Sequence, residues 1–380
     1  MKEKLSLPKG WEIKTIGDVC VSASSNVSQN KLANDEGNYP IYGASGLIKK
    51  VSFYHQDKPY LSIVKDGSGV GRITKMDAYT SVIGTLQYIL PKENIDLDYL
   101  NYSLMSVDFK KYVAGAAIPH IYFKDYKNEP FLWMPLPEQQ RIVSILDEAF
   151  AAIAKAKANA EQNLKNAKEL FESYLQGVFE KKGDGWEEKR FDEACVLQRG
   201  FDLPTHSRFE GEYPLVSSNG ITDRINQWKV KAPGVVTGRS GTIGNVHFIE
   251  EDFWPLNTAL YIKDFHGNDE RFIYYFLTAF DLSKYSSGAG VPTLNRNNVH
   301  SVKISVPKSK EEQQTIVRQL DALRAETQKL EAVYQKKIDD LEELKKSILQ
   351  KAFSGGLNLD VKDSQITTIR EKSRNHVNQA

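Results

Sequence analysis

The sequence predicts an α+β protein in which two similar globular domains alternate with two long helices. The line "GWEIKTIGDVC" at 10–20 returns as "GWEEKRFDEAC" at 185–195. Residues 138–179 and 312–353 are identical at 16 of 42 positions, at a constant shift of 174 residues. These two segments have helical apolar spacing, whereas the stretches before them carry short apolar runs bounded by turn residues. Because solenoid repeats span only about 20–50 residues, each copy is a whole domain.

Changes in composition along each copy set the predicted boundaries. The first part of each copy is rich in aromatic, glycine, serine and β-branched residues, and the second part is a long helix. The polar end of the chain, "KDSQITTIREKSRNHVNQA", is typical of a weakly ordered tail. We expect a globular domain at 1–137, a long helix at 138–182, a second globular domain at 183–310, a second long helix at 311–354 and a flexible tail at 355–380.

Each globular domain is expected to combine short strands with one helix. The helices are predicted at 96–113 and 269–286, where apolar residues recur at helical spacing. The strands are indicated by apolar runs between turn residues. These runs are "YLSIV" (60–64), "LQYIL" (86–90), "GVVTG" (234–238) and "ALYIKD" (259–264).

The two long helices carry the spacing of a coiled coil. Apolar or small residues recur in alternating steps of four and three, and no proline interrupts them. One seam is rich in alanine and the other in leucine, so we expect the helices to pair within the chain; pairing of each with a different protein is the alternative. The seams are Ile142, Leu146, Ala149, Ile153, Ala156, Ala160, Asn163, Ala167, Leu170 and Tyr174, and Ile316, Leu320, Leu323, Thr327, Leu330, Tyr334, Lys337, Leu341, Leu344 and Ile348.

The linker after the first long helix predicts an antiparallel pair. Only "KKGDG" (181–185) separates that helix from the second domain. A helix of ~40 residues is ~60 Å long, and so short a linker cannot carry the chain back along that length. We therefore expect a globular domain at each end of the helix pair and a pseudo-two-fold axis between the copies.

Composition excludes several classes of protein. No run approaches 18 apolar residues, so no transmembrane helix is expected. The lysines of "MKEKLSLPKGWE" precede no apolar stretch, which argues against a signal peptide and for a cytoplasmic protein. Cys20 and Cys195 lie at matching places and are expected to be small buried residues and not a disulfide. The net charge of +1 does not by itself indicate nucleic-acid binding.

Two similar domains related by a two-fold axis suit a ligand that has its own approximate dyad. Duplex DNA has one because its strands are antiparallel, and dimeric DNA-binding proteins use it to contact two half-sites. Here the two copies have diverged, so the expected target is two different half-sites separated by unread base pairs. At a net charge of +1 the chain would bind DNA weakly alone and would need basic partners that hold the duplex.

The order of motifs in each copy resembles the specificity subunit of type I restriction–modification enzymes. The resemblance covers essentially 1–359, although copy two lacks "LP" before Gly185 and its "ISVPKSKEEQQ" segment is longer than "LWMPLPEQQ". The motifs are the starts "LPKGWEIKTIGDV" and "GDGWEEKRFDEA", the segments "GAAIPHIYFKD" and "GAGVPTLNRNN", and the helix starts "LPEQQRIVSILD" and "KEEQQTIVRQLD".

The resemblance implies two target-recognition domains, spacer helices and no catalytic activity in the chain itself. It implies double-stranded DNA and two methylation subunits as partners, and restriction subunits bound through that complex. It also implies no cofactor on this chain, since S-adenosylmethionine, ATP and Mg²⁺ would be bound by the partner subunits.

The search for catalytic motifs agrees with that implication. The sequence contains no "NPPY"-type tetrapeptide, no GxxxxGK[ST] loop, no HExxH and no Cys/His pair at zinc spacing. The segment "DGSGVGRI" (66–73) spaces its glycines as GxGxG without a following helix pattern. The segment "GRSGTIG" (238–244) is one residue short of a nucleophile elbow.

The glycine turns offer a different chemistry. Backbone N–H groups there can approach phosphates, and neighbouring polar side chains can reach base edges. The two copies differ most in loops such as 41–50 against 215–224 and 119–127 against 292–300, as expected if each recognises a different sequence; ordinary polar surface loops are the alternative. The candidate DNA contacts are Ser45, Lys49, Ser68, Arg72, Lys75, His120, Tyr122 and Lys124 in copy one, and Ser218, Asn219, Arg224, Arg239, Ser240, Thr242, Asn245, Asn295 and Arg296 in copy two.

The starts of the long helices, "EQQRIV" and "EQQTIV", repeat where the loops differ. A feature present twice is expected to contact a partner present twice, and a helix start that caps its own backbone is the alternative. The candidate methylation-subunit contacts are Glu138, Gln139, Gln140, Glu312, Gln313 and Gln314.

Two other functions stay open at this point. One is a two-headed coiled-coil adaptor that joins two proteins and does not recognise DNA. The other is the specificity subunit of a related restriction system with differently arranged catalytic subunits.

Overall fold

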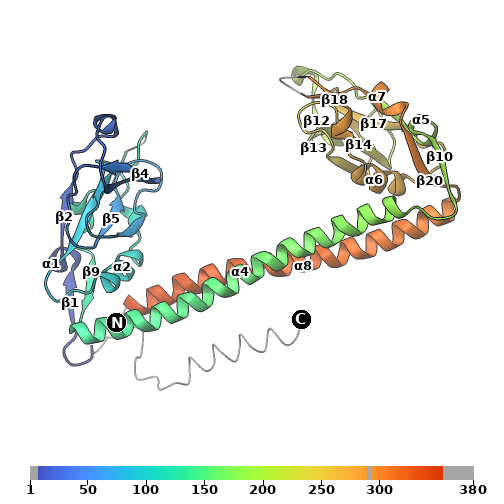
Figure 1. Cartoon of the computed structure of the whole chain (residues 1–380). Helices are drawn as coiled ribbons and strands as arrows, with labels where there is room; N and C mark the ends of the chain where they lie inside the picture. The colour runs from blue at the N-terminus through green and yellow to red at the C-terminus, as the bar shows by residue number, and fades with distance from the viewer. Residues whose placement is uncertain (1–6, 116, 289–291, 354–380) are drawn as a thin grey trace. The chain divides into compact units, whose positions relative to one another are not determined.

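Each copy of the repeat folds into β-sheets and short helices of its own in the computed structural model, which describes residues 7–115, 117–288 and 292–353 (Figure 1). The strands of copy one are β1 (Glu12–Thr15), β2 (Cys20–Ser24), β3 (Tyr39–Gly43), β4 (Gly46–Val51), β5 (Tyr60–Val64), β6 (Ile73–Met76), β7 (Ser81–Val82), β8 (Leu86–Pro91) and β9 (Pro130–Trp133). Those of copy two are β10 (Trp186–Arg190), β11 (Val196–Arg199), β12 (Glu210–Ser217), β13 (Gly220–Ile225), β14 (Gly234–Gly238), β15 (Val246–Ile249), β16 (Trp254–Pro255), β17 (Ala259–Asp264), β18 (Ser286–Ser287), β19 (Thr293–Leu294) and β20 (Lys303–Pro307).

The two copies have the same sheet topology. Copy one forms the sheets β1-β9, β2-β8-β5-β6 and β4-β3-β7, and copy two forms β10-β20, β11-β17-β14-β15 and β13-β12-β16 in the corresponding order. Copy two adds the short pair β18-β19. The three-stranded sheet of each copy contains one parallel pair, β3 with β7 in copy one and β12 with β16 in copy two. The predicted α+β repeat is confirmed, and the four predicted strand segments correspond to β5, β8, β14 and β17.

The short helices also recur at matching places. The predicted helices at 96–113 and 269–286 are shorter than expected, because each ends early and a separate 3₁₀ turn follows. Asp108 and Asp281 start these turns by accepting hydrogen bonds from the backbone of Lys110 and Ser283, a local alternative that competes with helix continuation. The elements are α1 (Ile16–Val19), α2 (Leu97–Met105), α3 (Phe123–Tyr126), α5 (Phe191–Ala194), α6 (Glu270–Ala279) and α7 (Arg296–His300), with 3₁₀ turns at Gln29–Leu32, Phe109–Tyr112, Thr205–Ser207 and Leu282–Tyr285.

The long helices are α4 (Leu136–Lys181) and α8 (Lys310–Phe353). The chain divides into two compact units, and this division passes through both helices. One unit contains the chain up to Asn159 together with the stretch from Lys337 onward, and the other is Ala160–Lys336. Each unit thus combines one globular domain with a part of each helix. The predicted domain boundaries stay a prediction, and the tail predicted at 355–380 lies outside the described residues.

The helices pair in an antiparallel sense within each unit. In the first unit Ile142 and Leu146, near the start of α4, share a core with Ala352 at the end of α8. Lys157 and Glu342 form an ion pair of 2.6 Å between the same two helices. In the second unit the cluster joins the end of α4 to the start of α8, through Phe171, Leu175, Val317 and Leu320. The start of one helix therefore packs beside the end of the other.

The buried seam departs from the predicted heptads toward one end of each helix. Leu170 and Leu330 are 52% and 42% exposed. Phe171, next to Leu170, is buried instead, and in α8 the buried residue is Ile338, next to Lys337 of the predicted seam. An α-helix drifts by ~20° per heptad from an exact seven-residue repeat, so about five heptads shift the seam by one residue. The helix pair follows the 3.6-residue period of an unstrained helix.

The cysteines are free and buried, as predicted. Burial raises the pKa of the Cys20 thiol to about 12, and burial also raises the pKa of Cys195. Among the described helices, none is both long and apolar enough to cross a membrane.

Candidate nucleic-acid interface

Three loops of each globular domain meet beside the central four-stranded sheet. We call them the hairpin tip (43–46 in domain one, 217–220 in domain two), the glycine loop (65–72 and 239–245) and the closing segment (119–122 and 292–295). The glycine loop follows β5 or β14, the middle strand of its sheet. The hairpin tip joins β3 to β4 or β12 to β13. The hairpin tip and the closing segment were selected from the sequence because they differ most between the copies, and the glycine loop because of its glycine turns.

The backbone frame of these loops is the same in both domains. Lys65 N–H donates to Thr85 O at 3.0 Å, and Arg239 N–H donates to Thr258 O at 2.9 Å. The carbonyl of Lys65 accepts from Ile121 N–H at 2.9 Å, and the carbonyl of Arg239 accepts from Leu294 N–H at 2.7 Å. Lys65 and Arg239 are therefore structural counterparts.

The hairpin tip is tied to the glycine loop in each domain. In domain one the Arg72 guanidinium donates to the carbonyl of Ala44, next to Ser45. In domain two the Thr242 hydroxyl donates to Ser218 O at 2.8 Å and to Asn219 Oδ1 at 2.7 Å. In domain one the structure thus brings the predicted residue Arg72 close to Ser45. In domain two it brings Thr242 into contact with Ser218 and Asn219.

Glycine is required in these loops for conformation as well as for space. Gly67, Gly69 and Gly71 have φ of +91°, +92° and +86°, a region that residues with a Cβ rarely adopt. In domain two a Cβ on Gly238 would lie 2.0 Å from Thr242 O. Most backbone N–H groups of the domain-one glycine loop are bonded within the domain, such as Gly67 N–H to Pro119 O and Gly71 N–H to Val64 O, so the side chains are the main groups left for a ligand.

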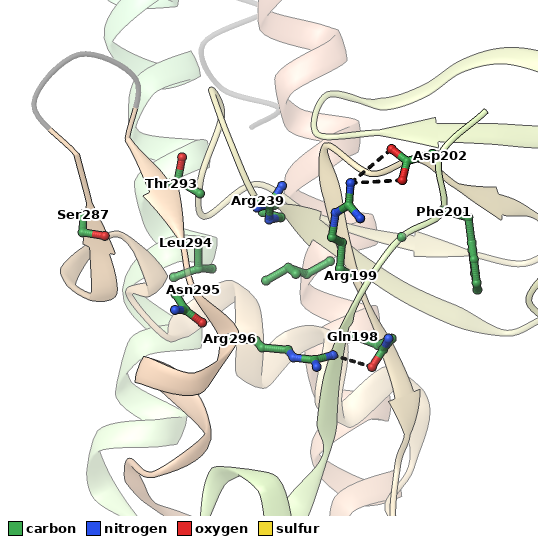
Figure 2. Close-up of a pocket in the computed structure, with 12 residues that line it drawn as sticks. Gln198, Arg199, Phe201, Asp202, Arg239, Ser287, Thr293, Leu294, Asn295 and Arg296 are labelled. Carbon is green, nitrogen blue, oxygen red and sulfur yellow. Dashed lines mark hydrogen bonds and ion pairs between the residues drawn. The ribbon is translucent and has the colours of Figure 1, made fainter. Parts of the chain in front are cut away.

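Domain two has a cleft of about 660 Å³ between β11, the glycine loop and the closing segment (Figure 2). It contains the predicted residues Arg239, Asn295 and Arg296. Five other polar residues that line it were not predicted from the sequence, namely Gln198, Arg199, Asp202, Ser287 and Thr293. Figure 2 shows the side chains of β11 on one side and those of the closing segment on the other, with Arg239 between them.

The arginines of this cleft are oriented by neighbouring groups. Arg199 Nη2 donates to both carboxylate oxygens of Asp202, at 3.1 and 3.2 Å. Arg296 Nη1 donates to Gln198 Oε1. Arg239 Nη1 donates to the carbonyl of Asn257 at 3.3 Å, and the amide of Asn257 donates in turn to Asp202. Each guanidinium keeps further N–H groups for a ligand, because it carries five donors.

The lysine and arginine candidates outside this cluster are engaged in their own domains. Lys75 forms an ion pair with Asp98 at 2.6 Å, and Lys49 donates to Leu32 O at 3.0 Å. Arg224 pairs with Glu251 at 2.7 Å and holds the pKa of that carboxyl below its usual value. Exposed ion pairs contribute only ~0–1 kcal/mol, so these side chains can still be exchanged to a phosphate.

The remaining candidates lie on the same loops. Ser68 and Asn245 are exposed in the glycine loops, and the backbone of Ser240 forms a bridge to the closing segment. The rings of His120 and Tyr122 are 4.9 Å apart. Lys124 Nζ lies 5.2 Å from the centroid of the Tyr122 ring.

Gln139 and Gln313, predicted to contact a partner, are instead closed inside their own domains, with 0% and 2% exposure. Gln139 Oε1 accepts from Asp96 N–H, and Nε2 donates to Asn94 O and Met134 O, at 2.8–3.0 Å. This corrects the expectation for these two residues, because a buried amide with every bond satisfied internally cannot reach a partner.

Gln313 makes the matching set of bonds in the second unit. Its Oε1 accepts from Asp269 N–H at 2.8 Å, and its Nε2 donates to Asn268 Oδ1 at 2.7 Å and Pro307 O at 3.1 Å. The repeated "EQQ" start therefore fixes each long helix to its own domain. Gln140 and Gln314 are exposed, and Glu138 and Glu312 are partly exposed, so these four stay available to a partner.

The residues that were not predicted include Lys65, the first residue of a glycine loop, and Arg199 and Asp202, at and just after the end of β11. Lys65 could have been found from the repeat, since a shift of 174 residues places it on Arg239. Arg199 and Asp202 gave no such signal, because β11 is brought beside the glycine loop only through the strand order β11-β17-β14.

Comparison with known proteins identifies the family. The model of the type I restriction modification DNA specificity domain matches twice, at residues 8–165 and 183–342. The chain belongs to this family. Each specificity-domain match takes in one globular domain and part of the long helix that follows it.

Two curated relatives are specificity subunits from Escherichia coli. The chain is 27% identical over 177 residues to the type I restriction enzyme EcoprrI specificity subunit, a match that spans 44% of each chain. It is 22% identical over 408 aligned positions to the EcoDI specificity subunit, covering 92% of this chain and 89% of that subunit. The family membership inferred from the sequence is therefore confirmed.

Solved structures of specificity-domain proteins share the fold. A chain from a structure that describes complex assembly and conformational transition of the type I R-M system has a TM-score of 0.75 at 18% identity, covering 93% of this chain and 100% of that chain. The HsdS subunit from Thermoanaerobacter tengcongensis has a TM-score of 0.56 at 18% identity, covering 92% and 98%.

Proposed function

We propose that the chain is the DNA specificity subunit of a type I restriction–modification complex, in which each globular domain recognises one half of a bipartite, asymmetric target. The observation that carries this proposal is the common loop frame, in which the backbone bonds of Lys65 and Arg239 match while the surrounding side chains differ. Because the loop backbones of the two domains match, they present their side chains in the same way. Because those side chains differ, the two domains select different DNA sequences.

The loops supply the contacts in this proposal. In domain one they are the hairpin tip with Ser45, the glycine loop with Ser68 and Arg72, and the closing segment with His120 and Tyr122. To these we add Lys65, whose backbone is bound in the same way as that of Arg239. In domain two the corresponding residues are Ser218, Asn219, Arg239, Ser240, Thr242, Asn245, Asn295 and Arg296.

Partner subunits would supply most of the affinity for DNA. The net charge of +1 leaves little sequence-independent attraction to phosphates. We propose that two methylation subunits hold the duplex, and that restriction subunits join through them. The exposed residues Glu138, Gln140, Glu312 and Gln314 are the revised candidates for docking the methylation subunits.

The chemistry of modification and cleavage would then belong to the partners. Among the described residues, no group of three or more His, Cys, Asp or Glu side chains is placed to hold a metal ion. We propose that S-adenosylmethionine, ATP and Mg²⁺ bind to the partner subunits, and that the complex acts in the cytoplasm, where its DNA and ATP are found.

A gel-shift selection tests DNA recognition. The chain is incubated with a pool of random duplexes, alone and with methylation subunits from the same restriction system, and the retained DNA is sequenced. We expect weak, unselective retention by the chain alone and enrichment of one sequence by the complex. Retention of partner protein without any enriched DNA sequence would support a protein adaptor and contradict the proposal.

Light scattering tests the assembly. Titration of the chain with methylation subunits is expected to end at two subunits per chain, because the helix start that carries the exposed glutamine occurs twice. Replacing Gln140 and Gln314 with Arg should weaken uptake of one subunit each. A complex that takes up only one methylation subunit would contradict the two-site arrangement.

A further inference from the structure

We infer that the cleft of domain two recognises a G·C base pair, with Arg239 donating to guanine and Asp202 accepting from the amino group of cytosine. This inference rests on the proposed function and deepens it, because it names the base pair and the domain that selects it. Domain one lacks this combination of arginine and carboxylate, so the inference does not extend to its half-site.

The lining of the cleft combines donors with an acceptor. A site for phosphate alone would favour cations, and a carboxylate would repel the DNA backbone. Asp202 is nevertheless exposed at the cleft, with a side-chain exposure of 61%. A carboxylate suits the cytosine amino group, and an arginine fork suits the N7 and O6 acceptors of guanine. The two kinds of group together are complementary to a G·C pair.

Asp202 and Arg239 are held as a unit. Asn257 connects them, since its backbone carbonyl accepts from Arg239 Nη1 and its side-chain Nδ2 donates to Asp202 Oδ1. Arg199 fixes the other side of the carboxylate through one nitrogen, Nη2. The other guanidinium nitrogens of Arg239 have no acceptor among the described residues. Arg239 can therefore place paired donors on a base edge, with Arg199 as a positioning residue.

The amide side chains of the cleft do not favour adenine. Recognition of adenine needs an amide whose oxygen accepts from N6 while its nitrogen donates to N7. Gln198 Oε1 already accepts from Arg296. Asn295 Oδ1 already accepts from Asn297 N–H at 3.0 Å, because Asn295 caps α7. Each amide oxygen is thus oriented toward a protein donor and keeps one lone pair, whereas Arg239 presents several N–H donors that no described residue accepts.

Domain one has different chemistry at the same positions. The strand registers place Ala23 and Ser24 of β2 where Gln198 and Arg199 of β11 lie. The closing segment places Tyr122 where Asn295 lies, and Lys65 is the counterpart of Arg239. One lysine thus replaces a set of three arginines. Lysine can also donate to guanine, so what is confined to the half-site of domain two is recognition of a G·C pair by an arginine together with a carboxylate.

Selection from a random duplex library by the full chain with its methylation subunits tests the inference. The wild-type complex is expected to enrich a target with an invariant G·C pair in one half. Arg239→Ala and Asp202→Ala should each relax that pair, and Lys65→Ala should affect only the other half. Arg190→Ala is the matched control, since Arg190 pairs with Asp192 outside the cleft and should change neither half.

A second measurement separates base recognition from phosphate contact. Replacing the selected guanine with 7-deazaguanine removes one acceptor and leaves every phosphate in place. The wild-type complex should lose about 10- to 100-fold in affinity, as for one good base contact, and the Arg239→Ala complex should lose nothing further. Retained selection at the remaining positions of the same half-site shows that domain two of each variant is folded.

The outcomes separate the inference from the proposed function. If the wild-type complex enriches no sequence, the proposed function fails. If it enriches a bipartite target and Arg239→Ala weakens all sequences equally without relaxing any base pair, Arg239 contacts phosphate and the inference alone fails. A wild-type target without an invariant G·C pair in either half also overturns the inference alone.

Discussion

Truncating Gln139 to alanine separates a structural role from a docking role at the start of α4. The side chain has 0% exposure and makes three hydrogen bonds to the backbone of its own domain. The variant leaves the Met134 carbonyl buried without this partner, which costs ~1–3 kcal/mol. The bonds to Asp96 and Asn94 are only partly buried, so water can replace them at a net loss of ~0.5–1.5 kcal/mol each.

Released side-chain entropy offsets part of this loss. A buried glutamine gives up as much as ~1.5–2 kcal/mol of rotamer freedom on folding, so the net destabilisation is expected to be about 0.5–4 kcal/mol, with a central value of ~2 kcal/mol. It should fall on the first unit only. The matching variant Gln313→Ala should destabilise the second unit by a similar amount, since Gln313 makes an equivalent set of bonds.

Native-state hydrogen exchange followed by peptide mass spectrometry measures each unit separately, which a single melting curve of a two-unit chain cannot do. Gln140→Ala and Gln314→Ala are the matched controls, because both side chains are exposed, and each should change stability by no more than ~0.5 kcal/mol. If Gln139→Ala leaves exchange in the first unit unchanged and weakens only the binding of methylation subunits, the structural assignment is wrong.

Three further predictions follow from buried groups and from the helix pair. Burial lowers the pKa of His300, so its neutral ring stabilises the second unit above pH ~6.5 and this contribution is lost as pH falls below that value. Between pH 5 and 7 the protection factors of that unit, which correct exchange rates for their intrinsic rise with pH, should therefore increase less in His300→Gln than in the wild type. Cys20 and Cys195 should not react with a thiol reagent at pH 8 until the chain unfolds, because burial raises both pKa values, and rapid labelling of the folded chain would contradict their burial. Eleven residues inserted into both helices beside the Lys157–Glu342 pair should keep the seam in register, since eleven residues nearly complete three turns. The longer helices should abolish tight binding to the parental DNA target. Unchanged affinity would show that the helices do not set the spacing of the half-sites.

The strands and the repeat could be predicted from the sequence because they depend on local patterns. Runs such as 60–64 and 234–238 are apolar, β-branched and bounded by turns, and they match β5 and β14. The ends of the predicted helices failed where aspartates such as Asp108 and Asp281 start a new turn. The predicted seam departs gradually from the buried residues along the helices, because the difference between a seven-residue repeat and the 3.6-residue period grows with each heptad.

The candidate site was predicted only where the chain itself marks it. Glycine loops and divergent polar residues pointed to Arg239, Thr242 and Asn295. Asp202 and Arg199 enter the same cleft through sheet topology, which local sequence does not encode. The misassigned Gln139 shows that a motif repeated in both copies can record a shared internal contact as readily as a shared partner.

Sequencing of the DNA selected by the full chain with its methylation subunits tests the central claim most directly. The account predicts two short conserved blocks of unlike sequence, separated by a gap of fixed length in which no base is preferred. One block should change with Lys65→Ala and the other with Arg239→Ala. A single continuous block, or two blocks that both change with either variant, would contradict the assignment of one half-site to each domain.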